Sequence, residues 1–90
     1  MLSIIVKKNA ELIDESGKAV HYEYKLIEHN EIYNIVCINN SSFTEEVYTG
    51  VSDDKEVAVK VFNLICKESV APEHLNCIID DILSEICYGI

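Results

Sequence analysis

The chain has 90 residues, of which 49% are hydrophobic and 26% are charged, and its formal net charge is −9. A chain of this length builds one domain with a modest core, so we expect a single domain over residues 1–90. It contains no arginine, and its lysines are scattered. Nucleic acid binding requires clustered cations that neutralise phosphates, so the composition argues against nucleic acid as a partner.

Neither a membrane span nor a secretory signal is expected. The apolar runs are only a few residues long, whereas a membrane-spanning helix needs ~20 apolar residues. The first lysines, Lys7 and Lys8, follow the N-terminal apolar stretch, and a secretory signal has the reverse order. We therefore expect a cytoplasmic protein that does not bind membranes.

Four cysteines, Cys37, Cys66, Cys77 and Cys87, each stand among apolar neighbours. No two of them have the Cys-x-x-Cys spacing of a zinc knuckle or a redox motif. A free cysteine behaves as a small apolar residue in a protein core. We expect these cysteines to be reduced and structural, as is usual in the cytoplasm.

The apolar pattern has a period of two up to about residue 52 and a helical period after it. Turn-forming residues interrupt the first part at residues 15–18, 29–30 and 39–42. The pattern therefore predicts four strands, with hairpin connections, at residues 2–12, 20–27, 32–38 and 43–51.

The strand patterns also predict which residues share a face. Tyr22, Tyr24 and Leu26 alternate with polar residues. Residues 32–38 are apolar on both faces, which places that strand in the middle of the sheet. The last strand is expected to carry its valines, 47 and 51, on one face together with Thr49, and Gly50 marks a bulge or a frayed end.

Two amphipathic helices are expected at residues 53–66 and 73–87. Ser52 or Asp53 is expected to cap the first helix, because Asp53 and Glu56 have capping-box spacing. Pro72 suits the first turn of the second helix, and Gly89 suits its end.

These elements predict an α+β fold. A four-stranded antiparallel meander (residues 1–51) is followed by two C-terminal amphipathic helices (residues 52–89), which pack on one face of the sheet. One apolar face of the sheet then meets the apolar faces of both helices and forms the core.

One candidate site is metal-binding or thiol-based. His74 and Cys77 are three positions apart on the second helix, so both can reach one ion, and Cys66 on the first helix is a possible third ligand. The alternative is structural: His74 contacts the neighbouring loop and fixes how the first turn of the helix docks. We favour the structural alternative and expect neither a metal nor another cofactor.

A second candidate is a partner-binding surface on the last helix. Its acids are Glu73, Asp80, Asp81 and Glu85, no lysine interrupts them, and Tyr88 follows. Such a face suits a cation or a basic protein partner. It also suits the solvated side of an ordinary amphipathic helix.

An enzyme has less support. No nucleophile elbow, phosphate loop or dinucleotide fingerprint is present, and three glycines cannot build a glycine-rich cradle. A small hydrolase or ligand-binding fold would need a deep pocket lined by His21 or His29.

Three segments carry a family resemblance: residues 22–27 (YEYKLI), residues 33–38 (YNIVCI), and residues 70–75 (VAPEHL) with the following IDDIL. In these the chain resembles a small bacterial family catalogued as domain of unknown function 6514, found mainly in clostridia-like Gram-positive bacteria. Asn34 and Ala71 stand where that family commonly has glycine and threonine, so the last helix lacks a threonine cap. The resemblance implies a fold pattern and no catalytic residues.

The interpretation that follows is a non-enzymatic protein-interaction or regulatory module, whose partner is another protein or a second copy of the chain. The alternative is a small metal-binding or thiol-redox protein that uses His74, Cys77 and Cys66.

Overall fold

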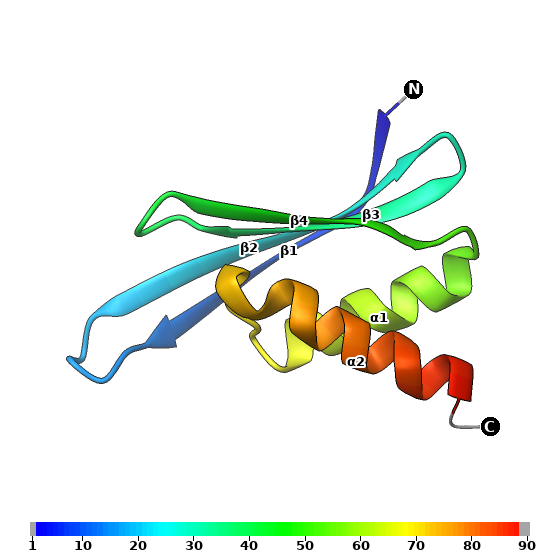
Figure 1. The fold of residues 1–90 in the computed structure, drawn as a ribbon. Coiled ribbons are helices and arrows are strands. Elements are labelled where there is room, and N and C mark those ends of the chain that lie inside the picture. Colours follow the sequence, from blue (N-terminus) through cyan, green and yellow to red (C-terminus); the bar gives the residue numbers. More distant parts are fainter. Residues whose placement is uncertain (1, 89–90) are drawn as a thin grey trace.

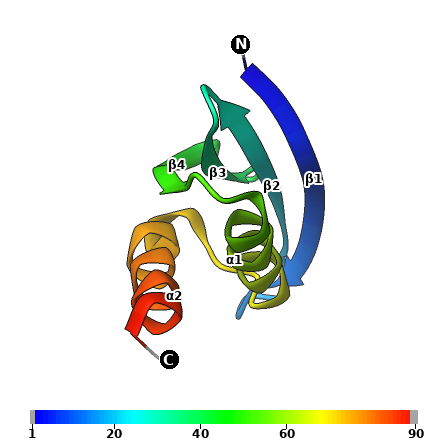
Figure 2. The ribbon, with the colours of Figure 1, turned by 90° about the vertical axis from the view of Figure 1, so that its right-hand side faces the viewer.

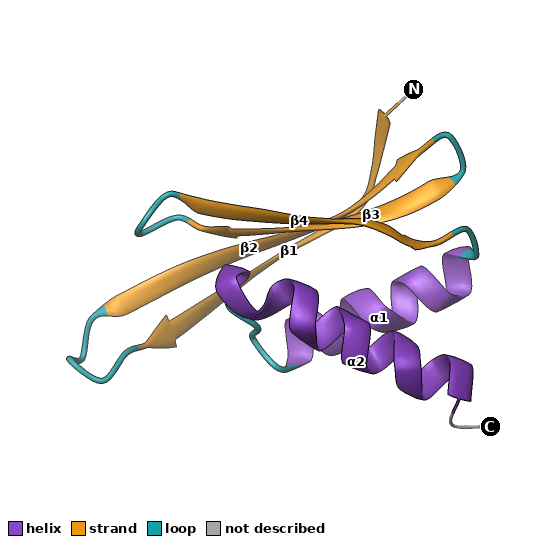
Figure 3. Ribbon diagram, in the orientation of Figure 1, coloured by secondary structure: helices purple, strands orange, loops and turns teal. Residues whose placement is uncertain are grey.

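The computed structural model describes residues 2–88. Its strands are β1 (Leu2–Ile13), β2 (Ala19–His29), β3 (Ile32–Asn39) and β4 (Thr44–Ser52). The helices are α1 (Lys55–Lys67), the short 3₁₀ helix η1 (Pro72–His74) and α2 (Leu75–Tyr88). The strands form one antiparallel sheet in the order β1-β2-β3-β4, and both α-helices lie against one face of it (Figures 1 and 3). The predicted α+β meander with its C-terminal helix pair is confirmed.

The hairpin turns follow from local chemistry. In the β1–β2 turn, the carboxylate of Asp14 accepts hydrogen bonds from the backbone N–H groups of Ser16 and Lys18, each at 2.9 Å. The Ser16 hydroxyl also donates to it, and these bonds hold the pKa of Asp14 below its usual range. In the β2–β3 turn, Asn30 and Glu31 both have positive φ, as a tight two-residue hairpin requires.

The core lies between the sheet and the helices. Figure 2 shows the sheet curving around α1, with β1 at its outer edge. Each fully buried aliphatic or aromatic side chain contributes roughly 1.5–3 kcal/mol relative to exposure. The fully buried apolar residues of this core are Tyr24, Leu26, Ile35, Cys37, Ala58, Val61, Phe62, Ile65, Leu75 and Ile79.

Gly50 forms a bulge in β4. Residue pairing with β3 shifts between Tyr33, which faces Ser52, and Ile35, which faces Tyr48. Gly50 adopts a φ of 74°, which a glycine reaches without strain. Its N–H donates to the side-chain oxygen of Asn34 at 2.8 Å, so the amide opposite the bulge holds it in place. Of the two alternatives for Gly50, the structure shows the bulge.

The bulge makes the predicted common face of Val47, Thr49 and Val51 wrong. Val51 is buried in the core, whereas Val47 pairs with Val36 and is 44% exposed. Three residues of β4, Thr49 to Val51, lie opposite the single Asn34 of β3, so the simple alternation of faces is broken there. Val47 therefore belongs to the sheet face that the helices leave open.

The helix starts also differ from the prediction. The N-cap of α1 is Asp54, whose carboxylate accepts from the N–H of Glu56, and Ser52 instead accepts from the N–H of Asp54. The second helix begins with the 3₁₀ turn at Pro72, and its cap residue Ala71 makes no side-chain capping bond. The predicted stop at Gly89 lies outside the described residues.

Between residues 2 and 88, no helix is long and apolar enough to cross a membrane.

The cap assignment predicts that Asp54→Ala lowers the free energy of unfolding by about 1 kcal/mol, because it removes the acceptor for the Glu56 N–H. Asp53→Ala is the matched control, because Asp53 is an exposed neighbouring residue and its substitution removes the same charge. Urea unfolding monitored by circular dichroism measures both. An equal loss in the two variants would contradict the assignment.

Candidate functional site

The connection between α1 and α2 is anchored on the sheet through one carbonyl group. The Val70 carbonyl accepts from the Tyr24 hydroxyl at 2.8 Å and from the Cys37 thiol at 3.4 Å, and all three residues are buried. Burial raises the pKa of Tyr24 well above its ordinary value and that of Cys37 to about 12. Both groups therefore stay protonated and can donate at neutral pH.

The role expected of His74, fixing how the last helix docks, stays a prediction. The His74 side chain is exposed and lines a shallow groove of about 460 Å³ beside the α1–α2 connection, together with Val70 and Ile78. Pro72 and Leu75 are fully buried, and their burial stabilises this turn. Ala71 has the extended backbone that the residue before a proline favours, which also suits this turn.

The proposed ligands His74, Cys77 and Cys66 do not form a recognisable metal site. Cys77 is exposed and Cys66 is half-buried. Burial raises the pKa of the Cys66 thiol, which disfavours the thiolate that both metal binding and redox chemistry need. Among the residues that the structure describes, no group of three or more His, Cys, Asp or Glu side chains could hold an ion.

The acidic residues of the last helix divide into two sets. Asp80 accepts a hydrogen bond from the Tyr48 hydroxyl, and Asn76 donates to Glu46 at 3.4 Å, so this side of α2 is fastened to β4. Glu73, Asp81 and Glu85 are exposed. The side chain of Tyr88 lies outside the described part of the chain.

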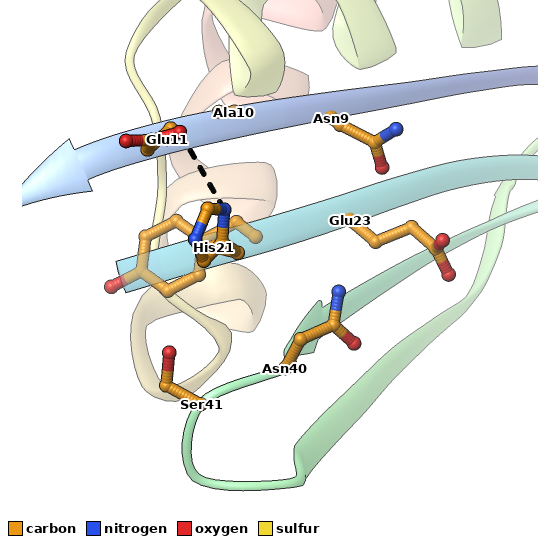
Figure 4. Close-up of a pocket in the computed structure, with 8 residues that line it drawn as sticks. Asn9, Ala10, Glu11, His21, Glu23, Asn40 and Ser41 are labelled. Atoms are coloured by element: carbon orange, nitrogen blue, oxygen red, sulfur yellow. Dashed lines mark ion pairs between the residues drawn. The ribbon is translucent and has the colours of Figure 1, made fainter. Parts of the chain in front are cut away.

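A hollow of about 570 Å³ lies over β1, β2 and the turn that follows β3. Figure 4 shows His21 on its floor, with an imidazole nitrogen 3.8 Å from the Glu11 carboxylate, and Asn40 and Ser41 on the turn. His29 does not line it. A hydrolase would need a nucleophile within hydrogen-bond reach of the histidine, whereas His21 faces a carboxylate on the neighbouring strand.

The sheet face away from the helices, which we call the open face, carries an apolar stripe. The stripe consists of Ile4, Ile27, Val36 and Val47, one from each strand. Ile4 faces Ile27 across β1 and β2, and Val36 faces Val47 across β3 and β4. Ile27 and Val36 are diagonal neighbours, a distance that aliphatic side chains can bridge.

The stripe is separate from the helix-side core. Val36 is only 5% exposed, although it is not part of the core cluster between the sheet and the helices. Ile4 is 57% exposed at one end of the stripe, and Val47 is 44% exposed at the other. Sequence reasoning missed the stripe as a site. The signal was present in residues 32–38, whose apolar residues on both faces were used only to place the strand centrally.

Charged side chains border the stripe on β1 and β2. Glu23 lies 3.2 Å from the Lys7 ammonium and 3.5 Å from that of Lys25, all on the open face. The hydrogen bond from Lys7 is the main cause that holds the pKa of Glu23 below its usual range. The open face therefore has an apolar stripe with ion-paired side chains beside it on β1 and β2.

The fold and the open face together define a small two-layer α+β protein with one sheet face covered by helices and the other available. The model of a family of unknown function (DUF6514) matches residues 3–85. The chain therefore belongs to this family, as the resemblance in its three segments indicated. No curated protein and no solved structure matches it.

The Tyr48–Asp80 bond predicts a small but specific effect on stability. Asp80→Asn keeps an acceptor oxygen but removes the charge, so we expect the free energy of unfolding to fall by up to about 1 kcal/mol. Asp81→Asn, at the exposed neighbouring position, is the matched control and should be nearly neutral. Urea unfolding at neutral pH measures both.

The difference in the free energy of unfolding between wild type and Asp80→Asn is expected to depend on pH. The hydrogen bond to Asp80 raises the pKa of Tyr48 from 10.0 to about 12, so its stabilisation is complete below pH 10 and is lost as the pH rises through about 12. Repeating the unfolding measurement in alkaline buffers checks this. A difference that grows with pH would contradict the assignment.

Proposed function

We propose that this protein is a non-enzymatic protein-interaction module of the bacterial cytoplasm, which binds its partner through the open face of the sheet. The observation that carries the proposal is the stripe of Ile4, Ile27, Val36 and Val47, which crosses all four strands on the side without helices.

A continuous apolar stripe has a cost in an isolated two-layer domain. Water stays in contact with Ile4 and Val47, and covering apolar surface gains roughly 25 cal/mol per Å². The helices already cover the opposite face of the sheet, so they cannot also shield the stripe from water. A partner with an apolar surface would gain this energy by packing on the open face.

The charged border supplies selectivity. Lys7, Glu23 and Lys25 form ion pairs at the side of the stripe, where a bound partner would leave them at the rim. Charges in such positions steer a partner and fix its orientation more than they add affinity. The exposed acids Glu73, Asp81 and Glu85 lie on the other layer, and we propose them as a secondary contact for a basic segment of the partner.

The state of the cysteines supports the cytoplasmic location. Cys37, Cys66 and Cys77 are free thiols, and Cys37 is buried as a hydrogen-bond donor in the core. Reduced cysteines with structural roles are typical of cytoplasmic proteins. The alternative role in metal binding or thiol redox chemistry has no comparable support, because Cys66 is held as a protonated thiol.

The proposal predicts that a photoreactive benzoylphenylalanine at position 47 forms a discrete covalent adduct with a protein in cells that naturally produce the chain. Val47 is chosen because it is the exposed end of the stripe. Lys60, an exposed position on α1, is the matched control site and should give no such adduct. Electrophoresis and mass spectrometry of the adduct identify the captured chain.

Two results would contradict the proposal: no adduct from position 47, or the same adducts in equal yield from positions 47 and 60. The identity of the captured protein also matters, because a second copy and a different protein give adducts of different mass.

A further inference from the structure

The edge strand β1 is long and unpaired on its outer side. It spans Leu2–Ile13 and ends the sheet order, so no described strand pairs with its outer edge. The helices make their main contacts with β2, β3 and β4 rather than with β1 (Figure 2). Unpaired backbone groups along such an edge are a template for another strand. Ile13, at its end, is 66% exposed.

We propose that two copies of the chain pair antiparallel through β1, around a two-fold axis at Asn9, and so form one eight-stranded sheet. This inference rests on the proposed role in protein interaction, for which it names a second copy as one partner. The open faces of both copies then lie on the same side of the joined sheet, and both stripes remain available.

The register follows from the side chains of β1. With Asn9 opposite its own copy, Lys7 of each chain faces Glu11 of the other. Both of these charges lie on the open face, where their side chains are 53% and 60% exposed. Opposite charges in facing positions stabilise a strand pair. The two-fold axis makes this contact twice.

The remaining pairs in this register are also matched. Val6 faces Leu12 on the helix side, where both side chains are half-buried within a single copy. Moving the two-fold axis by one residue, to Lys8, places Lys8 opposite Lys8 of the other copy. Moving it to Ala10 places Lys7 opposite Ile13. The first alternative brings like charges together, which is destabilising, and the second leaves Lys7 opposite an apolar side chain without a partner charge, so the register centred on Asn9 is the favoured one.

The other edge strand is less suitable. β4 carries Glu45 and Glu46 but no lysine, so self-pairing would bring acids together without a cation. The bulge at Gly50 also interrupts its edge, whereas the register shift of β1, between Ile4 and Val6, lies at one end of the proposed pairing. Pairing of β1 with β4 of another copy would repeat without closing and would produce filaments, whereas pairing of β1 with itself closes as a dimer.

Sedimentation velocity of the full chain between roughly 1 µM and 1 mM tests the proposal, because an edge interface is smaller than the standard one and is expected to be reversible. Wild type is expected to show a monomer–dimer equilibrium. Lys7→Glu and Glu11→Lys should each raise the dissociation constant at least about tenfold, since each creates two like-charge pairs.

The charge-swapped double variant, Lys7→Glu with Glu11→Lys, should restore dimerisation. Within one copy these positions are about 13 Å apart along the strand, too far to contact each other, so rescue must act between copies. Lys25→Glu is the matched control, because Lys25 also pairs with Glu23 on the open face but lies on β2. It should leave the dissociation constant nearly unchanged. Circular dichroism confirms that each variant is folded.

A monomer at all concentrations, a ladder of filaments, or a dimer that the charge swap does not restore would each overturn the pairing through β1. None of these results bears on the adduct at position 47, which tests the open face separately. A dimer without that adduct would instead contradict the proposed binding surface while leaving β1 pairing intact.

Discussion

The arrangement of this protein depends on one backbone carbonyl. The Val70 carbonyl lies in the connection between the helices, is buried, and accepts from Tyr24 on β2 and Cys37 on β3. An unpaired carbonyl in that place would cost roughly 1–3 kcal/mol, so the two donors decide whether the connection can lie over the sheet. With Val70 fastened, Leu75 and the buried side of α2 meet the strands, and one face of the sheet is closed.

That closure leaves the second face uncovered. The two helices that follow the meander form one layer, which covers one face of the sheet. The Val70 contact and the Tyr48–Asp80 bond hold both helices on this side. Val47 lies on the uncovered side because it pairs with Val36, and the bulge at Gly50 lets Val51 reach the core from the same strand. The stripe and the free edge of β1 thus both result from the order of elements, in which only two helices follow the four strands.

The order of elements and the fold class could be predicted from the sequence because the change from strand to helix periodicity at residue 52 is strong. The N-cap could not be assigned to Asp54 rather than Asp53 from the sequence. Adjacent aspartates offer the same capping chemistry, and the backbone conformation before α1 decides which of them caps it. The faces of β4 were mispredicted because the bulge at Gly50 interrupts the alternation of faces between Tyr48 and Ser52. The Val70 carbonyl contact could not be predicted, because a carbonyl has no sequence signature and Tyr24 and Cys37 are distant from it in the chain. The open-face stripe needs strand register, which hydrophobic pattern alone does not fix.

Alkylation of Cys37 under native conditions tests the role of the Val70 carbonyl most directly, because the thiol is buried at this contact and is accessible only when the connection opens. Iodoacetamide labelling followed by peptide mass spectrometry compares wild type with Tyr24→Phe, and the exposed Cys77 serves as the internal reference. Our account predicts that Cys37 in wild type reacts at least about a thousandfold more slowly than Cys77, and that Tyr24→Phe accelerates only Cys37, by about fivefold or more. Equal labelling of Cys37 in the two proteins would contradict it.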